Sequence, residues 1–164
     1  MPYPILIVLC GAPGSGKSTM ADALYEDFGF QIVCPDDIRE ELLGDASDQS
    51  QGDWIFSTAY ERLRQSLDAG FPGAVFDATN CTRRARRQVL DQANGHFGYA
   101  ICAVSSTDLD TCLDRNSSRS RYVPEDVIRR MHSNLMECLP DVSEGFEEVL
   151  DVNDLYSRIR ELLR

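Results

Sequence analysis

The chain has 164 residues, which is enough for one domain with a full hydrophobic core and too few for two domains of ordinary size. Hydrophobic residues make up 43% of it and charged residues 26%, which excludes a disordered chain, and the net charge of −11 argues against a large nucleic-acid footprint. Because no apolar run approaches the roughly 20 residues that span a bilayer and the N-terminus lacks the basic start of a signal peptide, we expect a cytoplasmic protein without a membrane segment.

Short apolar runs alternate with amphipathic segments along the whole chain. In chain order they predict a strand over 4–10, a helix over 17–28, a strand over 30–34, helices over 36–43 and 54–69, a strand over 73–76, a helix over 82–94, a strand over 99–104, helices over 109–115 and 124–138, a strand over 147–152 and a helix over 154–163. Thr82 is expected to cap its helix, and Gly70 to end the helix over 54–69. The alternation predicts an α/β fold, in which helices flank a parallel sheet of about five strands within a single domain over 1–164. Ligands of such sheets bind at the carboxyl ends of the strands.

The first strand leads into a glycine-rich loop that fits the pattern GxxxxGK[ST] in full and precedes a helix. Its glycines let the backbone curl so that N–H groups point at phosphate oxygens, and the helix N-terminus adds partial positive charge. Lys17 can reach the β- and γ-phosphates of ATP, and the Ser18 hydroxyl can ligate Mg²⁺. No other lysine occurs, so the NKxD motif that reads guanine in GTPases is impossible. We therefore expect ATP and Mg²⁺ as cofactors, bound by Gly11, Ala12, Pro13, Gly14, Ser15, Gly16, Lys17, Ser18 and Thr19.

Carboxylates follow the second and third strands. Phosphoryl transfer to a hydroxyl needs a group that accepts the proton and aims the oxygen, and Asp36 is placed to do this. Arg39 lies one helical turn further on and faces the same way. Asp36 could instead be only a helix N-cap, with Asp37 as a partner of the helix dipole. Asp77 ends the third strand, where a carboxylate commonly orders a Mg²⁺-bound water or a neighbouring arginine; the alternative is an Asp that starts a turn.

Arginines concentrate in residues 83–130, which carry a balance of +3 while the rest of the chain carries −14. Cations are disfavoured in the first turn of a helix, yet one such turn holds Arg83, Arg84, Arg86 and Arg87. This crowding suggests an anionic neighbour such as a substrate phosphate. Arginines on a polar flap can close over ATP and stabilise charge on the transferring phosphoryl group, and the segment before Pro124 holds Arg115, Arg119 and Arg121. Both clusters could instead be solvated basic surfaces.

The order of these motifs resembles that of the 5′-hydroxyl polynucleotide kinases, both the kinase domain of the phage enzyme and the kinase module of bacterial end-repair proteins. The motifs are GxPGSGKST, DDxR, DATN and RNxxR ahead of Val-Pro. The resemblance covers roughly residues 5–138. It implies a three-layer P-loop NTPase/kinase fold with an arginine-bearing lid over about 115–124.

The resemblance also implies roles for individual residues. Asp36 is expected to be the general base on the 5′-hydroxyl, while Arg39 holds the acceptor's phosphate and orients Asp36, and Asp77 supports that arrangement. The expected catalytic residues are Lys17, Asp36, Arg39 and Arg119. Nucleotide binding is expected from residues 11–19 together with Arg115 and Arg119, and Mg²⁺ binding from Ser18. Substrate binding is expected from Asp36, Arg39, Asp77, Thr79, Asn80 and Arg83.

We therefore expect ATP-dependent transfer of the γ-phosphate to the 5′-hydroxyl end of DNA or RNA, with nucleic-acid ends as the partner. One alternative is a small-molecule kinase that acts on a sugar, nucleoside or antibiotic hydroxyl, which the acidic body of the chain favours. A kinase of an aminoacyl-tRNA or similar large acceptor, and an ATP-binding protein without phosphotransfer, are the remaining alternatives.

Overall fold

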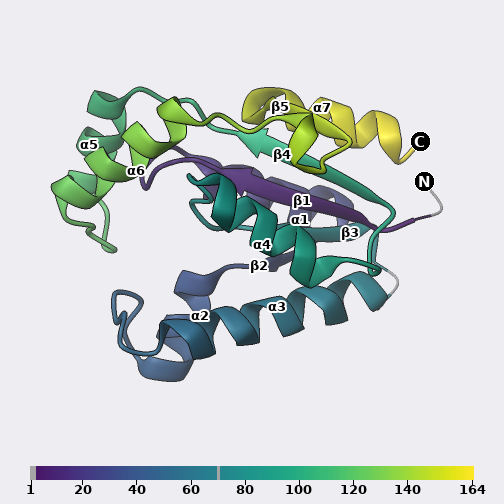
Figure 1. Ribbon diagram of the computed structural model, residues 1–164, viewed down its shortest axis with the longest axis horizontal. Helices are drawn as coiled ribbons and strands as arrows, with labels where there is room; N and C mark the ends of the chain where they lie inside the picture. Colours follow the sequence, from purple (N-terminus) through teal and green to yellow (C-terminus); the bar gives the residue numbers. More distant parts are fainter. Residues whose placement is uncertain (1–2, 70) are drawn as a thin grey trace.

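The structure is a computed structural model that describes residues 3–69 and 71–164. Its described residues form one sheet in which all neighbouring strands run parallel (Figure 1). The order across the sheet is β2-β3-β1-β4-β5. The strands are β1 (Ile5–Cys10), β2 (Gln31–Val33), β3 (Gly73–Phe76), β4 (Tyr99–Val104) and β5 (Glu148–Asp151). The predicted α/β fold with a parallel sheet of about five strands is confirmed.

Helices cover both faces of this sheet. Successive residues of the central strand β1 point to opposite faces, and all of them are buried, so each face must be covered. Leu6, Val8 and Cys10 pack in the same cluster as α3 and α4, whereas the residues between them pack with α1 and α7. The helical elements are α1 (Lys17–Phe28), α2 (Pro35–Leu43), α3 (Gly52–Asp68), α4 (Arg83–Ala93), α5 (Leu109–Ser117), α6 (Glu125–Glu137), the 3₁₀ turn η1 (Val142–Glu144) and α7 (Val152–Leu162).

Each predicted strand and helix lies within two residues of its observed bounds, although η1 was not predicted. The alternative role of Asp36 as an N-cap is wrong, because Cys34 takes that position with an extended backbone and Pro35 follows at the first helical position. Proline favours this position, since its fixed φ suits the first turn and its missing N–H would have no partner there. The predicted cap Thr82 accepts a hydrogen bond of 3.1 Å from the backbone of α4. Gly70, expected to end α3, lies outside the described residues.

The carboxyl ends of the strands meet at one edge, and the loops that leave them are joined to one another. The N–H of Gly11 donates to the carbonyl oxygen of Thr79 (2.8 Å), and the N–H of Asp77 donates to that of Val33 (2.8 Å). The helices α5 and α6 lie on one side of this edge and α2 lies on the other (Figure 1). Among the described helices, none has the length and apolar character that a membrane crossing requires.

Candidate active site

The loop between β1 and α1, here called the phosphate loop (residues 11–16), requires glycine at two positions. Gly14 and Gly16 have φ angles of 82° and 95°, in the left-handed region that side chains disfavour. A Cβ on Gly14 would lie 2.5 Å from the carbonyl oxygen of Cys112, and one on Gly16 would lie 3.2 Å from a nitrogen of Arg115. The spacing of the glycines therefore follows both from the backbone conformation and from the close approach of α5.

The phosphate loop is supported from behind and keeps a polar group without a partner. The carbonyl oxygen of Ser15 accepts hydrogen bonds from the hydroxyls of Ser105 (2.8 Å) and Thr107 (2.9 Å). The hydroxyl of Ser15 itself is buried and has no partner among the described residues. Because α1 begins directly after the loop, the N–H groups of its first turn also lack partners within the helix. These unsatisfied donors fit a bound phosphate group.

Ser18 and Asp77 join the start of α1 to the end of β3. The Ser18 hydroxyl donates to Asp77 Oδ2 (2.8 Å), and Asp77 is buried. Burial raises the pKa of Asp77, while the charge of Lys17 and the bond from Ser18 oppose that rise. Lys17 makes no ion pair with a described side chain. The hydroxyl and carboxylate oxygens match the ligands that Mg²⁺ prefers, and the unpaired ammonium suits an anionic ligand.

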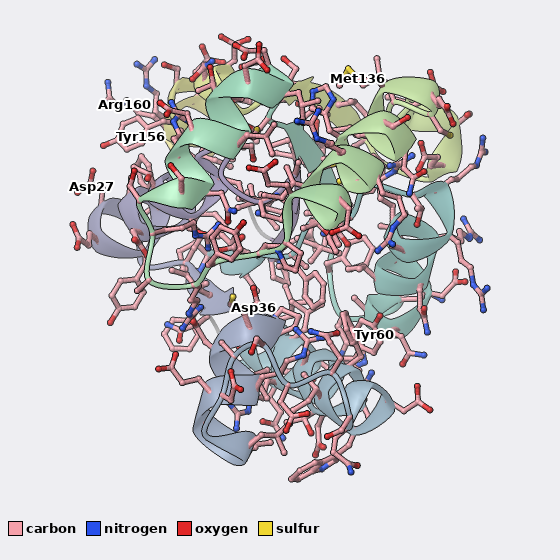
Figure 2. All side chains as sticks on the ribbon, turned by 90° about the vertical axis from the view of Figure 1, so that its left-hand side faces the viewer. Asp27, Asp36, Tyr60, Met136, Tyr156 and Arg160 are labelled. Atoms are coloured by element: carbon pink, nitrogen blue, oxygen red, sulfur yellow. The ribbon has the colours of Figure 1, made fainter. Side chains whose placement is uncertain are left out.

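Asp36 and Arg39 form an ion pair at the start of α2, after β2. Arg39 Nη1 donates to Asp36 Oδ1 (2.7 Å), and the side chain of Arg39 is 7% exposed whereas that of Asp36 is 52% exposed. The guanidinium carbon of Arg39 lies 5.6 Å from the ring centre of Phe56, and its buried Nε has no partner among the described residues. The structure therefore brings together a solvent-open carboxylate and a buried guanidinium with donors to spare. Figure 2, which faces the carboxyl ends of the strands, shows Asp36 near the middle of this face.

The predicted lid contains arginines with three different environments. Arg115, at the end of α5, donates to a carbonyl oxygen of the phosphate loop (3.3 Å). Arg119 is half-buried, and its side chain makes no hydrogen bond or ion pair with a described residue. Arg121 forms ion pairs with Asp37 (2.8 Å) and Glu40, both on α2. The lid loop, residues 118–124, is thus joined to the helix that carries Asp36.

Asn116 closes the lid loop at its base, a role that the sequence analysis missed. Its side-chain nitrogen donates to the carbonyl oxygen of Val123 (2.7 Å), and its side-chain oxygen accepts from the Val123 N–H (3.0 Å). The side chain of Asn116 is fully buried. An amide between the arginines of the RNxxR motif is the available signal, but only the fold shows which segment it holds.

Three further residues expected to bind the substrate have different environments. Thr79 is half-buried, and its backbone holds the start of the phosphate loop. Asn80 has φ 47°, is buried, and donates from its side-chain nitrogen to the carbonyl oxygen of Leu9 (2.7 Å). Asn80 thus supports the framework behind the phosphate loop, and its role in substrate binding stays a prediction. Arg83 is exposed at the start of α4 and forms no ion pair with a described residue.

For two of the arginines at the start of α4, the anionic neighbour is a carboxylate of the protein itself. Arg86 is fully buried, and its Nε and Nη2 donate to the carboxylate of Glu144 (2.7 and 3.3 Å). Arg87 donates to the backbone of Glu144 (3.0 Å) and pairs with Asp91 (3.2 Å). The signal for Arg86 was present in the sequence, because at helical spacing it shares a face with Val89, Leu90 and Ala93.

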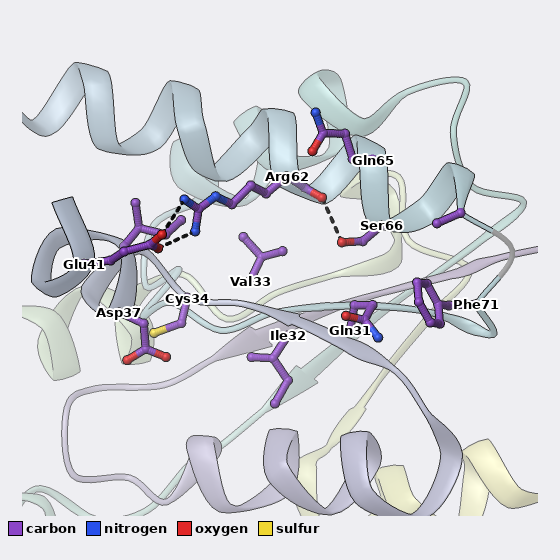
Figure 3. Close-up of a pocket in the computed structure, with 12 residues that line it drawn as sticks. Gln31, Ile32, Val33, Cys34, Asp37, Glu41, Arg62, Gln65, Ser66 and Phe71 are labelled. Carbon is purple, nitrogen blue, oxygen red and sulfur yellow. Dashed lines mark hydrogen bonds and ion pairs between the residues drawn. The ribbon is translucent and has the colours of Figure 1, made fainter.

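A groove of about 370 Å³ runs along β2, between this strand and α3 (Figure 3). Asp37 and Cys34 lie at one end and Phe71 lies at the other, while Arg62 of α3 pairs with Glu41 of α2 (2.7 Å). Two carboxylates and one guanidinium line the groove, a balance that does not favour phosphate. None of the residues of the phosphate loop contributes to it, although Asp37 at its end follows Asp36 on α2.

Comparison with known sequences gives one family and several relatives. Residues 6–138 match the AAA domain family. The L-seryl-tRNA(Sec) kinase of Methanococcus maripaludis is 25% identical over 96% of this chain and 66% of its own length. A putative bifunctional polynucleotide kinase/RNA ligase of Autographa californica nuclear polyhedrosis virus is 25% identical over 93% of this chain and 23% of its own length. The chain thus spans 66% of the length of the first of these relatives and 23% of the length of the second.

Solved structures show the same fold. A chain of the Pnkp1/Rnl/Hen1 RNA repair complex superposes with a TM-score of 0.68 and 22% identity, over 82% of this chain and 45% of that one. A gluconokinase from Sinorhizobium meliloti 1021 superposes with a TM-score of 0.60 and 19% identity, over 98% of this chain and 90% of that one. This chain therefore has a P-loop kinase fold. Because the similar proteins include a tRNA kinase, a polynucleotide kinase and a gluconokinase, the comparisons leave the acceptor open.

Proposed function

Because this chain belongs to the AAA domain family and has a P-loop kinase fold, we propose that it moves the γ-phosphate of ATP to the 5′-hydroxyl end of a DNA or RNA strand. Its kinase relatives support the coarser conclusion that it is a phosphotransferase. The nucleic-acid end is the finer part of the proposal and depends on the acceptor side of the site.

The observation that carries the proposal is the ion pair of Asp36 and Arg39. The exposed Asp36 carboxylate is available to accept the proton of a hydroxyl and to aim its oxygen at the γ-phosphate. A guanidinium has five N–H donors, and Arg39 uses one nitrogen on Asp36, so it retains donors for an anion beside that hydroxyl. A 5′-terminal nucleotide within a strand carries such an anion, because its own 3′-phosphate lies on the same sugar as its 5′-hydroxyl.

The donor side of the site supplies the remaining functions. Lys17 and the N–H groups of the phosphate loop would hold the ATP phosphates, and Arg115 already lies against that loop. Ser18 would ligate Mg²⁺, with Asp77 ordering its shell. When bound, Mg²⁺ neutralises charge that develops on the phosphates. Arg119, whose side chain has no partner among the described residues, would stabilise the transferring group from the lid.

The test is incubation with γ-labelled ATP, Mg²⁺ and an oligonucleotide that ends in a 5′-hydroxyl, with the 5′-phosphorylated strand as control. We expect label on the 5′-hydroxyl strand alone. Asp36→Asn should lower its rate by about 100-fold or more while ATP binding persists, because a positioned general base contributes at least that factor. Asp22→Asn, an exposed carboxylate change on α1, is the matched control and should leave the rate unchanged.

A second candidate is a kinase of a small hydroxyl compound. It is favoured by the gluconokinase structure, which matches this chain over nearly the full length of both, and by the acidic net charge. Unlabelled strands together with intact ATP binding would exclude the 5′-end kinase and favour this candidate. A panel of sugars and nucleosides would then identify the acceptor, and absence of any acceptor-stimulated turnover would leave an ATP-binding protein without phosphotransfer.

A further inference from the structure

The arginines of this acidic protein divide by whether its own groups engage them. Most form ion pairs, hydrogen bonds or ring contacts, as Arg86 does with Glu144 and Arg121 does with α2. Five have side chains without a hydrogen bond, ion pair or ring contact to a described residue. They are Arg83, Arg84, Arg119, Arg130 and Arg164.

Four of these five lie at the end of the molecule that carries the candidate site. Arg83 and Arg84 are the first residues of α4, which follows the loop of Asp77, and Arg130 is exposed on α6. The start of α4 contacts the end of α6, because Arg86 donates to the carbonyl oxygen of Cys138, the C-cap of α6 (3.0 Å). In Figure 2 both helices lie on the same side of Asp36.

From this arrangement we infer that Arg83, Arg84 and Arg130, here called the arginine track, bind the phosphates of a single nucleic-acid strand beyond its first nucleotide. This inference rests on the proposed function and extends it from the reacting end to the rest of the strand. Arg119 is not part of the track, because it lies on the lid and is proposed to act on the phosphoryl group of ATP.

Electrostatics favours a polyanion at this surface over a small acceptor. Arg83 and Arg84 stand in the first helical turn, where the helix dipole repels cations, and no described carboxylate forms an ion pair with either of them. Asp141 lies within reach of the charge of Arg83 without pairing with it. A phosphate backbone relieves this repulsion and releases its counterions. The strongly negative remainder of the chain repels the same backbone, so the strand is confined to the track. A sugar or free nucleoside carries no phosphate that these arginines could bind.

The experiment compares two double variants by two measurements. Arg84→Gln/Arg130→Gln removes two charges from the track, and Arg160→Gln/Arg164→Gln removes two exposed charges elsewhere, with Arg160 at the opposite margin of the face in Figure 2. The first measurement is the affinity for a fluorescent 12-nucleotide strand with a 5′-hydroxyl, determined at several salt concentrations in the absence of ATP. Turnover is measured with that strand and with a nucleoside 3′-phosphate.

We expect the track variant to bind the strand roughly tenfold more weakly, and to show a salt dependence shallower by about 1.4 in log–log slope, because each phosphate contact on a single strand contributes about 0.7. The control variant should match the wild type, and turnover of the nucleoside 3′-phosphate should not change in either variant. Equal strand binding by the two variants, or no strand binding by the wild type, overturns the arginine track. A third outcome separates the two proposals: the wild type binds the strand more tightly than the track variant but transfers no label to its 5′-hydroxyl. That result would support the arginine track and would refute only the proposed kinase reaction.

Discussion

The hydroxyl of Ser18 donates a hydrogen bond of 2.8 Å to the carboxylate of Asp77, and this bond joins the first turn of α1 to the residue that follows the buried strand β3. The carboxylate is removed from water at a position where burial raises its pKa, so its charge is costly to the folded protein without ligands. Sites that bind a cation commonly keep such a group at the expense of stability. The pair is therefore a place where function and folding have opposite requirements.

Asp77→Asn should separate these two requirements. An amide can still accept the bond from Ser18 but brings no charge toward Mg²⁺, so we expect turnover to fall by about 100-fold or more. Thermal unfolding without nucleotide should occur at an equal or higher temperature than in the wild type, because a buried charge is lost. Turnover across a Mg²⁺ titration and a thermal melt measure the two effects. A clear drop in melting temperature would contradict this account.

The buried ion pair of Arg86 and Glu144 should be the most destabilising pair to break. Arg86→Met or Glu144→Gln leaves one buried group without its partner, which costs about 3–5 kcal/mol in other proteins. Because the loss comes from the group left behind, the double variant should be less destabilised than the sum of the two single variants. Urea unfolding of the four proteins forms the thermodynamic cycle. Strict additivity would indicate that the two side chains act independently.

The ion pairs of Arg121 with Asp37 and Glu40 should keep the lid loop closed against α2. Asp37→Asn/Glu40→Gln removes both pairs and keeps every arginine at which trypsin can cleave. All three side chains are partly exposed, so global stability should change by less than about 1 kcal/mol. Cleavage within residues 115–124 should nevertheless become several-fold faster, because the loop opens locally.

High salt should produce the same faster cleavage of the lid in the wild type, since it screens exposed pairs. The control Asp22→Asn/Glu26→Gln removes two exposed carboxylates from α1, and it should be cleaved like the wild type. Unchanged cleavage of the Asp37/Glu40 variant would mean that other contacts, such as those of Asn116, hold the loop.

How much the sequence predicts depends on whether the relevant contact is local. Apolar periodicity places each strand and helix to within two residues, and the phosphate loop motif identifies Lys17 and Ser18 together. The order of the strands in the sheet depends on contacts between segments that are far apart in the chain, and the periodicity of apolar residues carries no information about such contacts. The partner of Arg86 is likewise 58 residues away in the chain, so helical spacing marks Arg86 as the arginine on the buried face of α4 but does not show that Glu144 pairs with it. The role of Asp36 as an N-cap failed for a local reason, because Pro35 moves the cap back by two residues to Cys34.

Glu148 should contribute stability that is lost in acid. Its carboxylate accepts bonds from Arg158 and from the hydroxyl of Tyr99 (2.6 Å), and the bonds from Arg158 hold its pKa below the ordinary value of 4.5. Below that value the unfolded chain binds a proton that the folded chain still excludes, so the stabilisation is present at neutral pH and disappears as pH falls through the lowered pKa. Glu148→Gln should cost about 1–3 kcal/mol at pH 7, as expected for hydrogen bonds to a charged group, and the difference from the wild type should shrink progressively below pH 4.5. Urea unfolding of both proteins at pH 7, 5 and 3.5 measures it. An equal difference at all three pH values would show that the charge of Glu148 contributes nothing and that only the shape of its side chain matters.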